Sequence, residues 1–380
     1  MKRHPPLAAL VAGVSAAAAI ATPAHAQWRA VVLHPPGLYA SSALASGGAS
    51  QAGYVFYSSQ SEAVPVVWSE DGVNHSSLLP PGWDYGRVFG ASGNRQVGTI
   101  NGFTTSRAAM WHGTAESFVE LNVVHPNYGS TQARSTAGNQ VVGESYFRPT
   151  GTQRAILWDA TTLAWTDLNP VGAQASLAVA TDGLRQGGRV RSTGQSEFRA
   201  ALWFGSAASY VDLHPPGYVR SQVNGLGADG GGAQVGSIQV AGQTARPVVW
   251  RGTMQSLVDL TPTAPGVRNA EVFATTGLVH AGHAVFQTTG LNAVLWLADD
   301  PNSLVNLHRF LGAGWTSSTV AAITRVDDTL YVAGRATRAN HPREMAVSWV
   351  IRNVPAPGTL APLLAGAALL AQRRRRGSPY

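Results

Sequence analysis

The chain has 380 residues, no cysteine, and a formal net charge of +7 from 27 Lys and Arg against 20 Asp and Glu. The absence of cysteine excludes disulfide bonds and cysteine-ligated zinc, so the apolar core must supply the stability of the fold. Six cations, Lys2, Arg3 and the run 373–376, lie near the two ends, which leaves 21 cations against 20 acids between them. This near-neutral body has no basic stripe for phosphate contacts, and we expect no nucleic-acid partner.

Residues 1–26 have the layout of a secretory signal peptide. Two basic residues precede a largely apolar run that ends near residue 21, and Ala24-His25-Ala26 stands before Gln27. Small residues at Ala24 and Ala26 are typical of a cleavage site. We therefore expect cleavage before Gln27 and export of the mature protein from the cytoplasm.

Residues 354–380 form a second processing segment at the other end. Pro355-Ala356-Pro357 precedes an apolar run of 13 residues (359–371), and Arg373, Arg374, Arg375 and Arg376 follow it. Such a run makes a helix of about 20 Å, which is shorter than the ~30 Å hydrocarbon core of a bilayer. We therefore expect a transient inner-membrane anchor with its arginines on the cytoplasmic side.

This tail resembles the PEP-CTERM sorting signal, in which a Pro-Glu-Pro motif precedes a short apolar helix and an arginine cluster. Ala356 stands where that family has Glu. The resemblance implies an exosortase-like processing enzyme as partner, removal of the tail, and a Gram-negative cell-envelope or biofilm-matrix location. A degenerate membrane anchor is the alternative, and it gives nearly the same location.

The body between the two segments, residues 27–353, is periodic. Seven short apolar runs end in tryptophan, at spacings of 43 to 53 residues, in the range of propeller repeats. These tryptophans are Trp68, Trp111, Trp158, Trp203, Trp250, Trp296 and Trp349. We infer seven repeats and expect the tryptophans to be core residues.

Each repeat has four short segments in a fixed order: a small-residue stretch, a glycine-centred run, the run ending in Trp, and a last segment after a polar turn. Their residue types and their Gly, Ser, Asn and Pro boundaries are typical of strands. A run such as RAALW (199–203) is mainly apolar on both faces, so it must be covered on both sides. We therefore predict an all-β, seven-bladed β-propeller with four strands in each blade.

The last segments of the repeats predict how the ring closes. They occur near Leu33, Leu79, Leu121, Leu168, Leu213, Leu260 and Leu307. None follows Trp349, whereas RAVVL (29–33) precedes the first complete repeat. We predict that residues 29–33 pair beside the run ending at Trp349 and complete the seventh blade. The two LHPPG copies, 33–37 and 213–217, then end equivalent outer strands, because proline cannot continue a strand ladder.

The repeat also resembles the HAF family of extracellular repeats, whose units carry A-x-x-W-x-G followed by D-L-x-P-x-G. Residues 200–205 with 212–217 match both parts, and 108–113 matches the first part before a looser Glu120-Leu121. The resemblance spans about residues 29–350. It implies architecture and an extracellular location, and no catalytic residue.

No catalytic or cofactor motif occurs in the sequence, neither HExxH, GxSxG, a P-loop nor a dinucleotide fingerprint. His34, His214 and His308 share one repeat position, but they belong to different repeats and should not converge on a metal ion. We therefore expect no catalytic residue, cofactor or metal site. The recurrent Asp167, Asp212 and Asp259 lie on outer strands, where we expect solvated or turn-capping roles.

Two departures from the repeat could mark a site. They are the charged group Asp182, Arg185, Arg189 and Arg191 in repeat four, and Asp229 followed by three glycines in repeat five. Surface drift is the alternative explanation of both.

Three functions remain open from the sequence. The first is a non-enzymatic surface or matrix protein that contacts protein or polysaccharide. The second is a glycan-binding module, for which Tyr39, Trp83, Tyr128 and Tyr218 are the candidate binding residues; packing of these aromatic residues into turns is the alternative. The third is a polysaccharide-cleaving enzyme, which would need a carboxylate pair facing the axis.

Overall fold

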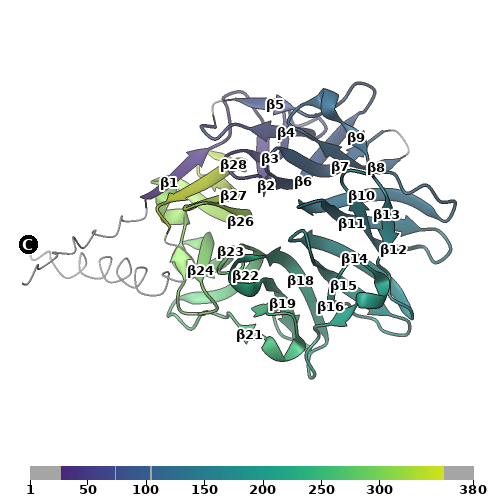
Figure 1. The fold of residues 1–380 in the computed structure, drawn as a ribbon. Helices are drawn as coiled ribbons and strands as arrows, with labels where there is room; N and C mark the ends of the chain where they lie inside the picture. Colours follow the sequence, from purple (N-terminus) through teal and green to yellow (C-terminus); the bar gives the residue numbers. More distant parts are fainter. Residues whose placement is uncertain (1–26, 73, 103–104, 355–380) are drawn as a thin grey trace, which may run out of the picture.

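The computed structural model describes residues 27–72, 74–102 and 105–354. They form seven four-stranded antiparallel sheets, which are arranged as blades around a central axis (Figure 1). The predicted seven-bladed β-propeller is confirmed. Ala24, Ala26 and the tail motif (Pro355, Ala356, Pro357 and Arg373 to Arg376) lie outside the described residues. None of the helices in the described ranges has the length and apolar character needed to cross a membrane.

Each blade is built outward from the axis. The first, innermost strands of blades 1 to 7 are β2 (Ala40–Ser46), β6 (Tyr85–Ser92), β10 (Tyr128–Ala137), β14 (Ala173–Thr181), β18 (Arg220–Gly227), β22 (Val267–Thr275) and β26 (Trp315–Val326). The second strands are β3 (Gln51–Phe56), β7 (Arg95–Asn101), β11 (Gln140–Phe147), β15 (Gln186–Ser192), β19 (Ala233–Gln239), β23 (Val279–Phe286) and β27 (Thr329–Arg338).

The outer half of each blade ends in a very short strand. The third strands are β4 (Val64–Trp68), β8 (Ser106–Trp111), β12 (Thr152–Asp159), β16 (Arg199–Trp203), β20 (Arg246–Trp250), β24 (Gly290–Leu297) and β28 (His341–Arg352). The fourth strands of blades 1 to 6 are β5 (His75–Ser77), β9 (Val119–Glu120), β13 (Trp165–Asp167), β17 (Val211–Asp212), β21 (Val258–Asp259) and β25 (Val305–Asn306). Short 3-10 turns lie between strands: η1 (Ala115–Ser117), η2 (Ala207–Ser209), η3 (Asp229–Gly231), η4 (Met254–Ser256) and η5 (His308–Leu311).

The fourth strand of blade 7 is β1 (Gln27–Val32), which closes the ring. It pairs antiparallel with β28, with Ala30 opposite Trp349 and Val31 opposite Ser348. Figure 1 shows β1 and β28 side by side at the left edge of the ring. The predicted closure by residues 29–33 is therefore confirmed.

The core consists of seven clusters, one at each junction between neighbouring blades. Each cluster contains the tryptophan of one blade and the outer-strand leucine of the blade before it, for example Leu33 of blade 7 with Trp68 of blade 1. All seven tryptophans are 0% exposed. In blade 1 this leucine is Leu78, one residue before the expected Leu79. The Leu78 N–H donates to the Pro65 carbonyl, and the outer-strand leucines of other blades donate in the same way, for example Leu121 to the Ala108 carbonyl.

A β-bulge occurs at the same position in every first strand. In blade 1 the pairing with β3 shifts between Ala43 and Ala45, which leaves Leu44 unpaired. The bulge residues are Leu44, Phe89, Arg134, Val179, Asn224, Phe273 and Ala321. An unpaired bulge residue changes the direction of its strand and of its own side chain. All seven bulge residues line the axial cavity.

The bulges explain the glycine-centred runs. Opposite each bulge, the second strand carries a glycine, and a Cβ there would collide with the carbonyl oxygen of the residue two positions before the bulge. These glycines are Gly53, Gly98, Gly143, Gly188, Gly236, Gly282 and Gly334. The repeat therefore needs glycine for close backbone approach rather than for a turn.

Candidate functional site

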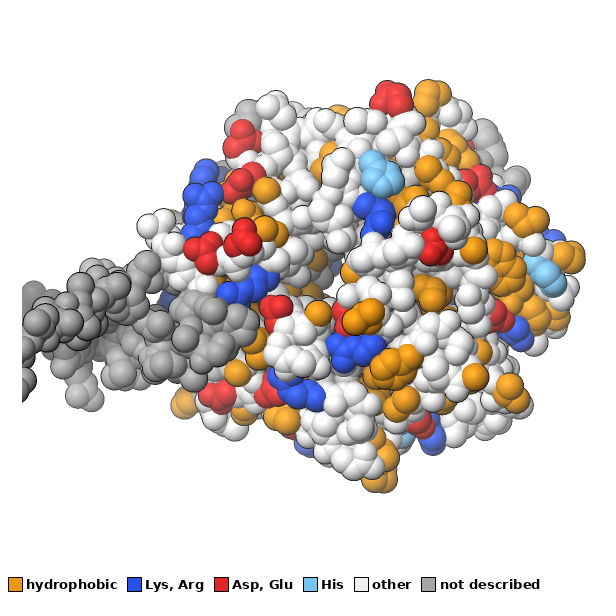
Figure 2. Space-filling model, in the orientation of Figure 1, with side chains coloured by type: hydrophobic (Ala, Val, Ile, Leu, Met, Phe, Trp, Pro, Cys, Tyr) orange, Lys and Arg blue, Asp and Glu red, His pale blue; other side chains and the backbone are white. Residues whose placement is uncertain are grey.

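The ring has two faces, which we name by the first strands of the blades. The start face is where these strands begin and where the chain crosses from one blade to the next. The end face is where they end. Figure 2 shows one face of the ring, on which charged side chains of both signs are distributed around a central hollow, several of them next to a side chain of opposite sign.

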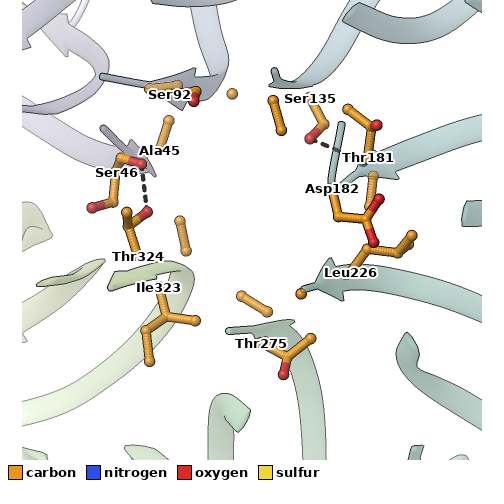
Figure 3. Close-up of a pocket in the computed structure, with 18 of the residues that line it drawn as sticks. Ala45, Ser46, Ser92, Ser135, Thr181, Asp182, Leu226, Thr275, Ile323 and Thr324 are labelled. Carbon is orange, nitrogen blue, oxygen red and sulfur yellow. Dashed lines mark hydrogen bonds between the residues drawn. The ribbon is translucent and has the colours of Figure 1, made fainter. Parts of the chain in front are cut away.

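An axial cavity of about 430 Å³ opens where the first strands end. Figure 3 shows the hydroxyl groups of Ser46, Ser92, Ser135, Thr181, Thr275 and Thr324 around it. Two hydrogen bonds join neighbouring blades here: Thr324 donates to the Ser46 carbonyl at 2.7 Å, and the Thr181 N–H donates to Ser135 at 3.3 Å. Part of the hydroxyl ring therefore holds the blades together.

Two acids line this cavity, Asp182 and Asp229. Both oxygens of Asp182 are in use, because Oδ2 pairs with Arg185 at 2.6 Å while Oδ1 accepts the backbone N–H groups of Leu184 and Arg185. Asp229 begins the η3 turn, and its Oδ2 is buried with no hydrogen-bond partner among the described residues. One of the two acids is thus committed to a turn, so the cavity does not present the two free carboxyl groups that glycoside hydrolysis requires.

A second cavity, of about 380 Å³, lies on the start face between blades 7 and 1. We call it the aromatic groove. Its walls include Tyr39, Tyr54 and Phe56 of blade 1 and Arg343 and Glu344 of β28. Tyr54 and Phe56 meet edge to face at 5.6 Å, and the Arg343 guanidinium lies 4.9 Å from the centre of the Tyr39 ring. The groove therefore combines half-exposed aromatic rings with charged groups.

The four aromatic residues singled out in the sequence lie at the start face of different blades and do not form one site. Tyr39 lines the aromatic groove. Trp83 packs on Phe118 at 6.0 Å, and Tyr218 packs against the core between blades 4 and 5. Tyr128 is buried and its hydroxyl donates to Asp167 at 2.5 Å; burial and this hydrogen bond raise the pKa of Tyr128 to about 12.

The repeated histidines form hydrogen bonds with serines of the next blade. Nδ1 of His34 lies 2.7 Å from the Ser41 hydroxyl, which also accepts the Ala346 N–H. His214 with Ser221 and His308 with Ser318 repeat this contact at 2.8 and 2.9 Å. Because the serine oxygen accepts a backbone N–H, its proton is free to donate to Nδ1, which favours the neutral imidazole. The described residues contain no group of three metal-ligating side chains.

The repeated aspartates have the expected turn-capping role. Oδ1 of Asp167 accepts the Asn169 N–H at 2.8 Å, and Asp212 and Asp259 accept the N–H two residues later at the same distance. Each of the three also pairs with the arginine that lies four residues before the tryptophan of its blade, for example Asp167 with Arg154 at 2.9 Å. They stabilise the outer edge of each blade.

Blade 6 contains a network that the sequence did not reveal. His280, 0% exposed, lies opposite the blade tryptophan, a position that holds glutamine in blades 1, 2, 4 and 5. Its Nδ1 lies 2.8 Å from the Thr275 hydroxyl and its Nε2 lies 3.0 Å from Asp299. The Arg251 guanidinium donates two hydrogen bonds of 2.9 Å to the same Asp299 carboxylate. This order of groups is that of a nucleophilic triad. However, the buried Thr275 oxygen also accepts the Gly277 N–H at 2.8 Å, so we assign the network a structural role.

No family model matches the chain, and no curated protein matches it in sequence. Among solved structures, the β-propeller domain of the Trilobed protease from Pyrococcus furiosus has a TM-score of 0.51 at 10% identity, covering 86% of this chain and 98% of that one. The shared fold is a β-propeller. That domain is described as having an open Velcro topology, whereas β1 closes the present ring. TolB from Acinetobacter baumannii has a TM-score of 0.41 at 10% identity, covering 77% of this chain and 78% of TolB.

Sequence reasoning found Tyr39 but missed the rest of the aromatic groove. Tyr54 and Phe56 follow Gly53 by one and three residues, and in blade 4 the same positions after Gly188 hold Arg189 and Arg191. The sequence had already singled out Arg189 and Arg191, and comparing these two positions across the repeats would also have found Tyr54 and Phe56, because the fold fixes the glycine and leaves the positions after it free to vary.

Proposed function

We propose that this protein is an exported, non-enzymatic polysaccharide-binding protein of the cell envelope or biofilm matrix, and that it binds sugar in the aromatic groove. The observation that carries the proposal is the cluster of half-exposed Tyr39, Tyr54 and Phe56 in a concave site. Concave sites lined by aromatic side chains with a few polar groups are the usual form of a small-ligand site. The groove lies beside the strand pair that closes the ring.

The chemistry of the groove suits a pyranose ring. The C–H groups of a sugar ring carry partial positive charge and pack on the negative face of an aromatic ring. Arg343 and Glu344 supply a donor and an acceptor for sugar hydroxyl groups, and Ser58 and Ser59 add two more hydroxyls at the rim. The non-enzymatic part of the proposal is supported by Asp182, whose oxygens are both used in a turn.

The two ends of the chain support the proposed export and cell-envelope location. β1 begins at Gln27, directly after the predicted signal peptide, and β28 ends at Arg352, just before the predicted sorting tail. The tail would make transient contact with the inner membrane and be removed by an exosortase-like enzyme. Fractionation of cells that express the full chain, or the chain without residues 355–380, tests this: retention in the membrane should need the tail.

Binding to immobilised neutral polysaccharides tests the groove. We expect the purified protein to bind at least one of dextran, galactan and cellulose, and Tyr54→Ala/Phe56→Ala to weaken that binding at least tenfold. Phe204→Ala is the matched control, because Phe204 is 52% exposed and lies after the tryptophan strand of blade 4, outside the groove. The proposal fails if no polysaccharide binds, or if the double variant binds as the unchanged protein does.

A further inference from the structure

Blade 4 carries two arginines that have no ionic partner in the part of the chain that the structure describes. Arg189 and Arg191 lie two residues apart on β15, so their side chains leave the same face of the strand. Neither forms an ion pair within the described residues, whereas Arg134, Arg154, Arg185 and Arg220 all do. Every cation of the body is an arginine, because Lys2 is the chain's single lysine. An unpaired pair of like charges at neighbouring positions is unfavourable unless something offsets it.

The two guanidinium groups are held in place by one aromatic ring. They lie 5.0 and 5.2 Å from the centre of the Phe198 ring. Nη1 of Arg189 also donates to Gln222 of blade 5 at 2.6 Å. Both side chains are half-buried, and the Nε atoms of both are shielded from solvent and have no hydrogen-bond partner among the residues described. The charges are therefore oriented before any ligand arrives, which reduces the entropy lost on binding.

The carboxylates near this pair are already engaged. Glu144 pairs with Arg134 at 2.6 Å, and Glu197 lies 3.9 Å from Arg220. Burial lowers the pKa of Arg189, and the nearby cations Arg220 and Arg134 lower it further. The Glu144 carboxylate has the opposite effect and only partly offsets them. The neighbourhood thus holds four guanidinium groups and two carboxylates, and the excess positive charge falls on Arg189 and Arg191.

The fold does not require arginine at these positions. The residues one and three places after the second-strand glycine are Tyr54 and Phe56 in blade 1, Thr99 and Asn101 in blade 2, and Ser237 and Gln239 in blade 5. Arg189 and Arg191 thus occupy the repeat positions that form the aromatic groove in blade 1. Two arginines that stack on groove aromatic rings, Arg87 over Tyr54 at 4.8 Å and Arg343 over Tyr39, also lack an ion pair within the described residues.

We propose that Arg189 and Arg191, stacked on Phe198, bind the carboxylate groups of an acidic polysaccharide on the start face. The proposal rests on the function proposed above and names its ligand class as a uronate polymer. A guanidinium group presents two N–H donors in a plane that matches a carboxylate. A sugar polymer is favoured over an acidic protein because the groove for sugar rings opens on the same face.

Polygalacturonate and its carboxyl-reduced form are the probes. We expect Arg189→Gln/Arg191→Gln to weaken binding of polygalacturonate at least tenfold and to leave binding of the reduced polymer unchanged. The matched control is Arg148→Gln/Arg268→Gln, which removes the same charge from the same face at residues without an ion pair within the described ranges; it should change binding less than twofold. The melting temperature of the double variant should not fall, because the substitution relieves repulsion.

The outcomes separate this inference from the proposed function. Equal binding of both polymers by the unchanged protein, or equal binding of polygalacturonate by the Arg189→Gln/Arg191→Gln variant, overturns the inference. So does binding of polyglutamate as tight as that of polygalacturonate, which would assign the site to acidic proteins. If only the inference fails, Tyr54→Ala/Phe56→Ala still weakens binding of the carboxyl-reduced polymer. If the proposed function fails, either no polymer binds or Tyr54→Ala/Phe56→Ala binds the reduced polymer as the unchanged protein does.

Discussion

Gln27 lies opposite Arg352 in the sheet of blade 7, so the first and last strands of the described chain are neighbours. Between them lie all the other strands of the ring. Closure therefore depends on contacts between residues more than 300 positions apart, such as the Ala346 N–H that donates to Ser41. Contacts of this separation are slow to form, because a long loop must close before they exist.

A disulfide across this closure should form and stabilise the protein. Val31 and Ser348 are partners in the antiparallel register, a geometry with Cα atoms about 4.5–5.5 Å apart that suits a disulfide. The chain has no other cysteine, so Val31→Cys/Ser348→Cys can form a single bridge. Closing so long a loop should add about 3–5 kcal/mol to the free energy of unfolding. Urea unfolding with and without reductant measures this gain.

The matched control places the second cysteine across the ring. Val31→Cys/Thr136→Cys pairs blade 7 with the first strand of blade 3, and both of its thiols should remain free. A thiol count after oxidation distinguishes the two variants. Free thiols in both would contradict the pairing of β1 with β28.

Adding a single methyl group opposite a bulge should destabilise a blade. A Cβ on Gly143 would overlap the Gln132 carbonyl oxygen, and backbone cannot move aside as a flexible side chain can. We expect Gly143→Ala to lower the free energy of unfolding by about 3 kcal/mol. Gly129→Ala is the control, because a Cβ there meets no atom closer than 3.4 Å. A change of less than 1 kcal/mol for Gly143→Ala would mean that the bulge is not tightly fixed.

The fold was predictable because the residues that each blade needs recur in the seven repeats. Trp203 and Leu213 recur with their blade, so their burial follows from periodicity alone. The first-strand bulge was not predictable, because Leu44, Arg134 and Phe273 share a position but no residue type. The sequence feature that accompanies the bulge is the glycine on the second strand. The pairing register is needed to show which residue that glycine faces.

The candidate site was less predictable for a physical reason. Repetition identifies what every blade needs, whereas a ligand is contacted by residues that only one blade has. Tyr54 and Arg189 occupy equivalent positions, and neither is needed for folding. Trp83 and Tyr128 show the converse, because an aromatic residue before a first strand can serve packing alone.

Stability should fall as the pH drops below about 6.5, since burial lowers the pKa of His34, His214 and His308 from the ordinary value of 6.5. The unfolded chain then takes up protons at a higher pH than the folded chain does, so protonation favours unfolding. The contribution is complete above pH 6.5 and is lost below it. Urea unfolding at pH 7.5, 6.5 and 5.5 measures the trend.

Blade 3 provides the control for this pH dependence. Asn169 takes the position of the histidines there, and its side-chain oxygen accepts the Ser176 hydroxyl at 2.8 Å. The triple variant His34→Asn/His214→Asn/His308→Asn should therefore fold and lose less stability between pH 7.5 and 5.5. Some loss should remain, because burial also lowers the pKa of His75 and His283. An unchanged slope in the triple variant would show that these histidines do not carry the effect.

Removing the charge of Asp299 should destabilise blade 6 at neutral pH. Burial alone would raise the pKa of Asp299, but hydrogen bonds from His280 and Arg251 outweigh it and lower the pKa from 3.8 to about 2. The folded chain thus holds the ionised form more firmly than the unfolded chain, a contribution of about 2 kcal/mol that is present above pH 3.8 and lost toward pH 2. Asp299→Asn should lower the free energy of unfolding by about this amount at pH 7. The difference in stability from the unchanged protein should shrink below pH 3.

The control is Asp84→Asn, at an exposed position on the start face, which should change stability by less than 0.5 kcal/mol at every pH. A deficit in Asp299→Asn that stays constant down to pH 2 would show that the side chain stabilises blade 6 by its shape and not by its charge.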